Sequence, residues 1–321
     1  EAPMSTGRAR AARAALRRVI LLAATAAAAA DAADAQYGGA WRVQMTEASR
    51  EKGLKGSWTS RGGMPVYVSE PGPLGHARPK TGYPVVIVAH HAVGIYHAAF
   101  LREFADDLAA EGYLAVLPDL FHRVWSDSVP NGQDMPFDRM NIPAMLASQD
   151  DGQIAADLEG VLELLAASVG LHADTERVVV LGFCMGGRIS WLAGVSPVLR
   201  RAVRGIVAYH GGNVWKALPP PAEGEAPRPG PGDQLAALGC PALGHFGGED
   251  KNPSPADMER LKEQAERAGK DVEFHLYEGA KHGFSCRDSA NYLELAARQS
   301  WTRTLAFLSR TIARPGAAQR T

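Results

Sequence analysis

The chain has 321 residues, of which 46% are hydrophobic and 21% charged, and its formal net charge is −1 at pH 7. This composition suits one globular domain with a substantial core, and without a basic stripe it gives no support for nucleic-acid binding. The three cysteines, Cys184, Cys240 and Cys286, show no CxxC spacing, so neither a zinc knuckle nor a disulfide framework is predicted.

Residues 1–35 differ in composition from the rest of the chain. Arginines within positions 8–18 precede an apolar run at 19–30, and small residues follow at Ala33 and Ala35. A basic region, a short apolar region and small residues at −3 and −1 are typical of a secretory signal peptide. The apolar run is also short for a membrane span. The alternative is an alanine-rich tail.

The leader has consequences for location and domain organisation. We expect a periplasmic or secreted protein whose mature chain begins near Gln36 and has no membrane contact after the leader is removed. Residues 1–3 precede the first methionine and can be a non-native extension. Residues 36–321 are predicted to form a single domain.

After the leader, apolar runs alternate with helical patterns. Short continuous apolar runs predict strands buried on both faces, at 84–89, 114–117, 178–181, 205–209, 242–246 and 272–277. Apolar residues three or four apart predict helices at about 100–111, 154–165, 258–268 and 292–309. The alternation predicts an α/β fold, with a doubly wound, mostly parallel sheet and helices on both faces. Ligands of such sheets bind beyond the carboxyl ends of the strands.

Two stretches break this alternation. Residues 122–148 read as a loop that either covers a pocket or runs over the surface. Residues 217–233 are rich in proline and glycine and are predicted to be a surface loop rather than a domain linker.

The stretch 182–187 (GFCMGG) follows a predicted strand and precedes a predicted helix. This is a nucleophile elbow with a cysteine, Cys184, in place of serine. Glycines flank the nucleophile because the turn is too sharp for neighbouring side chains. The helix N-terminus lowers a thiol pKa and offers the Met185 N–H to a developing oxyanion. The alternative is a buried structural cysteine.

In this fold an acid and a histidine follow the nucleophile in chain order. Asp250 comes soon after the predicted strand 242–246, and its neighbour Glu249 is the competing acid. His282 comes soon after the predicted strand 272–277. Each residue alone is unremarkable on a surface loop, but the ordered placement of all three predicts a Cys184–His282–Asp250 triad.

With these motifs, the chain resembles the dienelactone hydrolase (carboxymethylenebutenolidase) family over roughly residues 64–308. The resemblance rests on GFCMGG at 182–187, GGED at 247–250, KHGF at 281–284, EGYLAVLPDLFHR at 111–123 and AHHAVG at 89–94. It implies the α/β-hydrolase fold and hydrolysis of an enol-lactone or related ester by a Cys–His–Asp triad. It also implies that no metal or organic cofactor takes part, and that the backbone N–H groups of Met185 and Ala92 form the oxyanion hole.

The chain departs from the family pattern at two places. The family's glutamate beside the resting thiol corresponds to His91, which can act as a second base, stabilise the thiolate as an imidazolium, or simply pack the loop. Of the two arginines that hold the substrate carboxylate, one corresponds to Arg123. The other falls at Cys286, with Arg287 beside it. Half of the arginine pair does not specify a carboxylate substrate.

We therefore expect an exported, monomeric hydrolase that cleaves small-molecule esters or enol-lactones through a thioester intermediate. The alternatives are a cysteine-dependent thioesterase or peptidase on the same fold, and a non-catalytic exported binding protein. After export, a Cys240–Cys286 disulfide is a further possibility.

Overall fold

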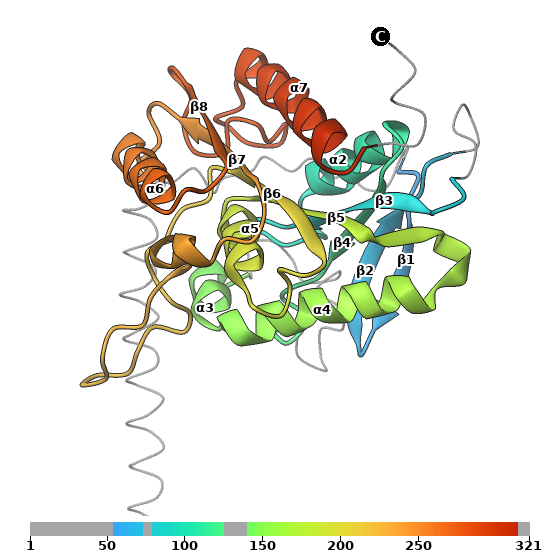
Figure 1. Ribbon diagram of the computed structural model, residues 1–321, viewed down its shortest axis with the longest axis horizontal. Helices are drawn as coiled ribbons and strands as arrows, with labels where there is room; N and C mark the ends of the chain where they lie inside the picture. The colour runs from blue at the N-terminus through green and yellow to red at the C-terminus, as the bar shows by residue number, and fades with distance from the viewer. Residues whose placement is uncertain (1–53, 73–78, 125–139, 314–321) are drawn as a thin grey trace, which may run out of the picture.

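The computed structural model describes residues 54–72, 79–124 and 140–313. Within these residues, eight strands form one sheet in the order β1-β2-β4-β3-β5-β6-β7-β8 (Figure 1). The strands are β1 (Ser57–Arg61), β2 (Met64–Ser69), β3 (Tyr83–Ala89), β4 (Leu114–Pro118), β5 (Ala173–Phe183), β6 (Val203–Tyr209), β7 (Ala242–Gly247) and β8 (Val272–Tyr277).

The sheet is mostly parallel, as predicted. β1 pairs with β2 and β2 with β4 in antiparallel fashion, whereas every pairing from β4 through β3, β5, β6 and β7 to β8 is parallel. All seven residues of β3 are buried, which fits a central strand covered on both faces. The parallel pairing brings the carboxyl ends of β3, β5, β6, β7 and β8 to one edge.

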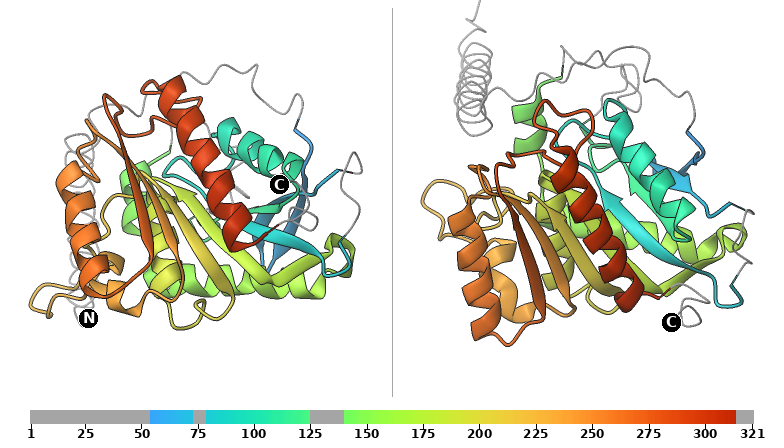
Figure 2. Two further views of the ribbon diagram at one scale, coloured as in Figure 1. Left: turned by 45° about the horizontal axis from the view of Figure 1, so that its top comes forward. Right: turned by 90° about the horizontal axis from the view of Figure 1, so that it is seen from above.

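Helices cover both faces of this sheet (Figures 1 and 2). They are α2 (Ala99–Ala110), α3 (Ile142–Ala147), α4 (Asp151–Ala167), α5 (Met185–Val195), α6 (Pro255–Arg267) and α7 (Glu294–Thr311). Phe104 of α2 and Phe307 of α7 pack in one apolar cluster, with side chains from one face of the sheet. Leu158 of α4, Trp191 of α5 and Leu261 of α6 pack in a second cluster, with side chains from the opposite face. The predicted α/β-hydrolase architecture is therefore confirmed.

The hairpin of β1 and β2 was not predicted. Its two-residue turn consists of Gly62 and Gly63, with φ values of 56° and 85°. Positive φ at both central positions is the requirement of a type I′ hairpin turn, which glycine meets at little cost. This Gly-Gly pair was the available sequence signal.

The two loop predictions need adjustment. Within 122–148, the described residues include the short helix α3 (Ile142–Ala147), whose N-cap is Asn141. The rest of that stretch, 125–139, lies outside the described residues. Residues 217–230 are non-helical as predicted, but the 3₁₀ helix η5 (Pro231–Ala237) begins before the predicted end of the loop.

The suggested Cys240–Cys286 disulfide is absent, because Cys184, Cys240 and Cys286 are all free thiols. Cys286 belongs to the apolar cluster beneath α2 and α7. Cys240 packs against the cluster beneath α4, α5 and α6, on the opposite side of the sheet. The sheet therefore separates the two thiols.

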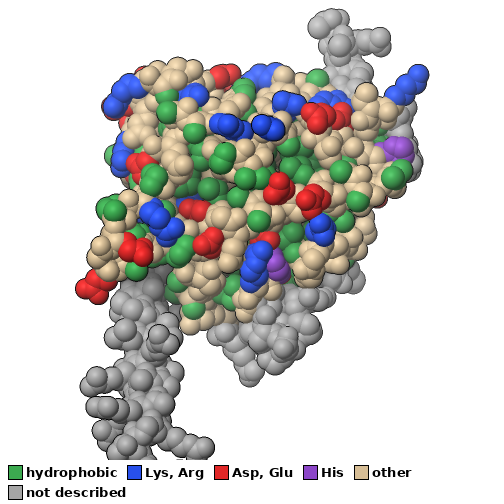
Figure 3. All heavy atoms as spheres, turned by 60° about the horizontal axis from the view of Figure 1, so that its bottom comes forward, with side chains coloured by type: hydrophobic (Ala, Val, Ile, Leu, Met, Phe, Trp, Pro, Cys, Tyr) green, Lys and Arg blue, Asp and Glu red, His purple; other side chains and the backbone are tan. Residues whose placement is uncertain are grey.

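The surface in Figure 3 carries interspersed acidic and basic side chains with apolar residues between them. This mixture agrees with the near-neutral net charge of the sequence. In the part of the chain that the structure describes, no helix is both long enough and apolar enough to cross a membrane.

Candidate active site

Cys184 lies between the end of β5 and the first residue of α5, with φ 55° and ψ −114°. A positive φ is strained for a residue with a Cβ atom, and it agrees with the strained conformation that a nucleophile elbow predicts. The Cys184 N–H donates to the carbonyl of Tyr209 (3.0 Å), and its own carbonyl accepts from the N–H of Arg188 (3.1 Å). Backbone hydrogen bonds to β6 and within α5 therefore hold the strained residue in place.

The glycines on either side of Cys184 are required by close packing. A Cβ atom on Gly182 would lie 2.1 Å from the carbonyl oxygen of Gly186. A Cβ atom on Gly186 would lie 2.0 Å from the carbonyl oxygen of Ala89, at the end of β3. No side chain fits at such distances, so the first turn of α5 packs directly on the backbone of β3.

Asp250 and His282 lie on the loops that follow β7 and β8, and their side chains meet. Nδ1 of His282 is 3.0 Å from Oδ2 of Asp250, whose side chain is 1% exposed. Oδ1 of Asp250 accepts the backbone N–H of Asn252 (2.9 Å), which fixes the carboxylate. Glu249 points to solvent, with 56% of its side chain exposed and its carboxylate 4.0 Å from Lys281. Asp250, not Glu249, is therefore the partner of His282.

The charges around His282 favour its protonated form. Burial lowers the pKa of the His282 ring, but Cys184, to which the ring is hydrogen-bonded, and the Asp250 carboxylate outweigh burial and raise the pKa to about 10. In general, a protonated imidazole beside a cysteine favours the thiolate, which is the nucleophilic form. Cys184, His282 and Asp250 are thus in one connected arrangement.

Cys184 and Met185 line a cavity of about 120 Å³. The other lining residues are Leu146, Arg188, Gly212, Asn213, Lys216 and Leu218. Arg188 is buried, and its guanidinium pairs with both carboxylate oxygens of Asp151 at 2.6 and 3.0 Å. This ion pair ties α5 to the first residue of α4.

The two predicted oxyanion donors follow neighbouring strands. The register pairs Ala89 of β3 with Gly182 of β5, and Ala92 and Met185 each come three residues later. Met185 is the first residue of α5, where backbone N–H groups lack partners within the helix. Ala92 is fully buried against Val93 and Ile142. Both backbones therefore lie at the carboxyl edge of the sheet, beside the elbow.

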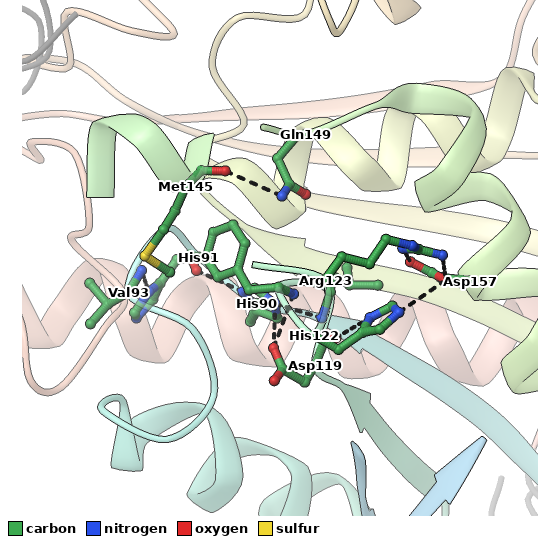
Figure 4. Close-up of polar contacts among 11 residues, drawn as sticks. His90, His91, Val93, Asp119, His122, Arg123, Met145, Gln149 and Asp157 are labelled. Atoms are coloured by element: carbon green, nitrogen blue, oxygen red, sulfur yellow. Dashed lines mark hydrogen bonds and ion pairs between the residues drawn. The ribbon is translucent and has the colours of Figure 1, made fainter. Parts of the chain in front are cut away.

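His91 and its neighbour His90 are buried, and their hydrogen bonds organise the backbone after β3 (Figure 4). Nε2 of His90 accepts the N–H of Leu120 (3.0 Å), and Nδ1 of His91 accepts the N–H of Val93 (3.1 Å). Burial and the charges of His90 and His282 lower the pKa of His91 to about 3. His91 is therefore neutral at pH 7, which argues against its stabilising a thiolate as imidazolium.

Arg123 does not line the cavity that contains Cys184. Its guanidinium pairs with both carboxylate oxygens of Asp157, at 2.5 and 2.6 Å (Figure 4). It borders a separate cavity of about 160 Å³ with Gln149 and other residues of the α3–α4 region. Arg287 forms an ion pair with Asp107, with 2.8 Å between a guanidinium nitrogen and a carboxylate oxygen. The structure therefore does not assemble the arginine pair that holds a carboxylate in the family.

His210 belongs to the site but was missed by the sequence reading. It follows β6 directly, and its ring lies 4.8 Å from the ring of His282, edge to face. Cys184, Asp250 and His282 were found because each comes soon after a predicted strand, and the same rule applied to the predicted strand 205–209 would have found His210. Among the described residues, no group of three or more His, Cys, Asp and Glu side chains could hold a metal ion.

The sequence of this chain is similar to those of known proteins from one family. Residues 75–312 match the profile of the Dienelactone hydrolase family. The Escherichia coli (strain K12) protein named "Putative carboxymethylenebutenolidase" is 32% identical over 242 residues, covering 73% of this chain and 80% of the relative. The "Carboxymethylenebutenolidase" of Pseudomonas putida is 30% identical over 234 residues, covering 72% and 87%.

A solved structure agrees with these sequence matches. The "Putative Dienelactone Hydrolase" from Klebsiella pneumoniae subsp. pneumoniae has a TM-score of 0.65 and 29% identity to this chain. The match covers 79% of this chain and 98% of the other.

The geometry of His91 generates a prediction about Cys184 reactivity. Because His91 is neutral and His282 carries the positive charge, His91→Ala should leave the pH profile of Cys184 alkylation by iodoacetamide unchanged. Alkylation should remain fast well below about pH 8.5, the pKa of a free thiol. The same variant should lower turnover by about 10- to 100-fold, because the loop carrying the Ala92 N–H loses its hydrogen bond. An alkylation profile displaced to higher pH would show that His91 stabilises the thiolate.

Proposed function

The chain belongs to the dienelactone hydrolase family and is a hydrolase of lactone or ester bonds, and we propose that it acts through a Cys184–His282–Asp250 triad and a thioester intermediate. The observation that carries this proposal is the connected arrangement of the three side chains. His282 bonds to Asp250 at 3.0 Å and to Cys184, and both interactions raise its pKa.

In the first half of the reaction, the Cys184 thiolate attacks the carbonyl carbon of the ester. The proton that left the thiol is held on His282, and Asp250 keeps the imidazolium oriented through Nδ1. The negative charge on the carbonyl oxygen is stabilised by the backbone N–H groups of Met185 and Ala92. His282 then protonates the leaving alcohol or enol, and a thioester on Cys184 remains.

In the second half, neutral His282 takes a proton from water, which attacks the thioester carbonyl. The second tetrahedral intermediate uses the same oxyanion donors, and Cys184 leaves as the thiolate while the acid product is released. Activated leaving groups suit a thiolate nucleophile, so enol-lactones and aryl esters are the proposed substrates.

The arginines support a substrate range broader than dienelactones. Arg123 is neutralised by Asp157 and Arg287 by Asp107, so neither is placed to hold a substrate carboxylate beside Cys184. We infer that the protein accepts esters and lactones without a second charged group.

Replacing the nucleophile tests this function. Cys184→Ala should reduce hydrolysis of aryl esters and lactones by at least about 10³-fold, and His282→Ala should be nearly as damaging, because the residues act as one unit. Steady-state assays on a panel of lactones, aryl esters, thioesters and peptides provide the measurement. Hydrolysis that survives Cys184→Ala would move the nucleophile elsewhere, and a preference for peptides would replace the proposed substrate class.

The acid assignment is tested by a matched pair of variants. Asp250→Asn should lower kcat by about 10²- to 10⁴-fold, because the amide no longer stabilises the imidazolium or its tautomer. Glu249→Gln removes a neighbouring charge that lies in solvent, so its kcat should remain within about twofold of wild type. A greater loss in Glu249→Gln than in Asp250→Asn would reverse the assignment.

We further propose that the protein is exported, on the basis of the arginine-rich and apolar pattern of residues 1–35. These residues lie outside the described part of the chain. Protein recovered from the periplasm or medium should begin near Gln36 on N-terminal sequencing. Accumulation in the cytoplasm of a chain that keeps the arginine-rich segment would refute export.

A further inference from the structure

His210 is a buried histidine that the mechanism above does not use. It is 1% exposed and follows β6 with φ 38°, in the left-handed region. Its N–H donates to the carbonyl of His245 on β7 (2.8 Å). A Cβ atom on the next residue, Gly211, would lie 2.6 Å from the backbone of Gly187. The His210 backbone is therefore held between β7 and the first turn of α5, which carries Cys184 at its start.

The His210 ring lies inside the loop that carries His282. The ring contacts His282 edge to face, with 4.8 Å between the ring centroids, and it packs edge to face on Phe284 with 5.7 Å between the centroids. Its Nε2 lies 3.3 Å from Oγ of Ser285 and 3.9 Å from Sγ of Cys286. Four residues of one six-residue stretch, 281–286, thus contact a single ring that comes from another strand.

The charges around the His210 ring keep it neutral. Burial, and next the positive charge of His282, hold the pKa of His210 well below its usual value of 6.5. The ionisable groups that interact with His282 are Cys184, Asp250 and the neutral rings of His91 and His210. A neutral ring excludes water from the imidazolium without repelling it, and attraction between buried charges is stronger where water is excluded.

We propose that His210 is a positioning residue for the hydrolysis, which holds the 281–286 loop through Ser285 so that His282 faces Cys184. This inference rests on the proposed function, because it assigns His210 to the placement of His282 in that triad. It concerns a residue that contacts His282 rather than the substrate. Its loss should therefore alter the pairing of His282 with Cys184 more than it alters substrate binding.

His245 provides a matched control on the neighbouring strand. It is fully buried and pairs in register with Tyr209, the residue before His210. Its ring bonds to the Tyr277 hydroxyl (2.9 Å) and to Oγ1 of Thr304 (3.0 Å), so it joins β7 to β8 and α7. His245→Phe therefore removes a buried histidine whose side-chain hydrogen bonds go to Tyr277 and Thr304 rather than to the 281–286 loop.

The experiment compares His210→Phe, His210→Gln, Ser285→Ala and His245→Phe in the full chain. For each variant, kcat and KM for an aryl ester, the pH profile of Cys184 alkylation by iodoacetamide, and the thermal midpoint are measured. His210→Phe should lower kcat by about 10- to 100-fold, because a displacement near 1 Å at the reacting groups costs about 10²-fold. KM should stay within about threefold, because binding of the ester is not the step affected.

The alkylation profile separates positioning from a structural role. In His210→Phe and Ser285→Ala the profile should move to higher pH, because a displaced His282 pairs less well with the thiolate. His210→Gln places an amide near the position of Nε2 and should recover most of the kcat and the wild-type profile. His245→Phe should lower the thermal midpoint with no movement of the profile.

Each contrary result has a distinct meaning. An unmoved alkylation profile in His210→Phe, or an equal movement in His245→Phe, would overturn the positioning role. If His210→Phe does not fold, Ser285→Ala decides, and a wild-type kcat and profile there would overturn the inference. Wild-type activity that is independent of Cys184 would instead overturn the proposed function, and the Cys184→Ala control reveals it.

Discussion

The site depends on the parallel pairing of the sheet from β4 to β8. Parallel strands end at the same edge, so residues that follow β3, β5, β6, β7 and β8 converge although they are up to about 190 positions apart in sequence. The backbone contact between Gly186 and the end of β3 then brings the elbow close to the loop of His91 and Ala92. The strained φ of Cys184 can persist because hydrogen bonds to neighbouring elements fix the backbone on both sides. The strand register therefore determines where the residues of the site lie, and their side chains then provide the chemistry.

The three histidines at this edge of the sheet differ in protonation state because their electrostatic surroundings differ. His91, His210 and His282 are all histidines in one buried region, and burial alone lowers the pKa of each. Of the three, only His282 faces both the Cys184 side chain and a carboxylate, and its pKa rises to about 10. The other two remain neutral, partly because of the charge on His282. One positive charge therefore lies beside Cys184, where the proposed thioester mechanism would use it.

Much of this arrangement was predictable from sequence because its signals are local. Cys184, Asp250 and His282 each stand just beyond an apolar run, and the glycines at 182, 186 and 187 mark the elbow. The pairing of Arg123 with Asp157 was not predictable, because the partner lies 34 positions away on α4 and no local pattern connects the two. His91 was assigned several roles from sequence because its protonation depends on burial and on distant charges. His210 was overlooked although it follows a strand in the same way, because its role depends on contacts with 282–286 that only the folded chain shows.

The central claim is that a covalent acyl group forms on Cys184 during turnover. Rapid mixing of the protein with an activated aryl ester, acid quenching and mass spectrometry of the peptide that contains Cys184 test this claim most directly. We expect a mass increase equal to the acyl group on Cys184, which forms in the first turnover and decays as substrate is consumed. Turnover during which the Cys184 peptide stays unmodified and fully reactive toward iodoacetamide would contradict it.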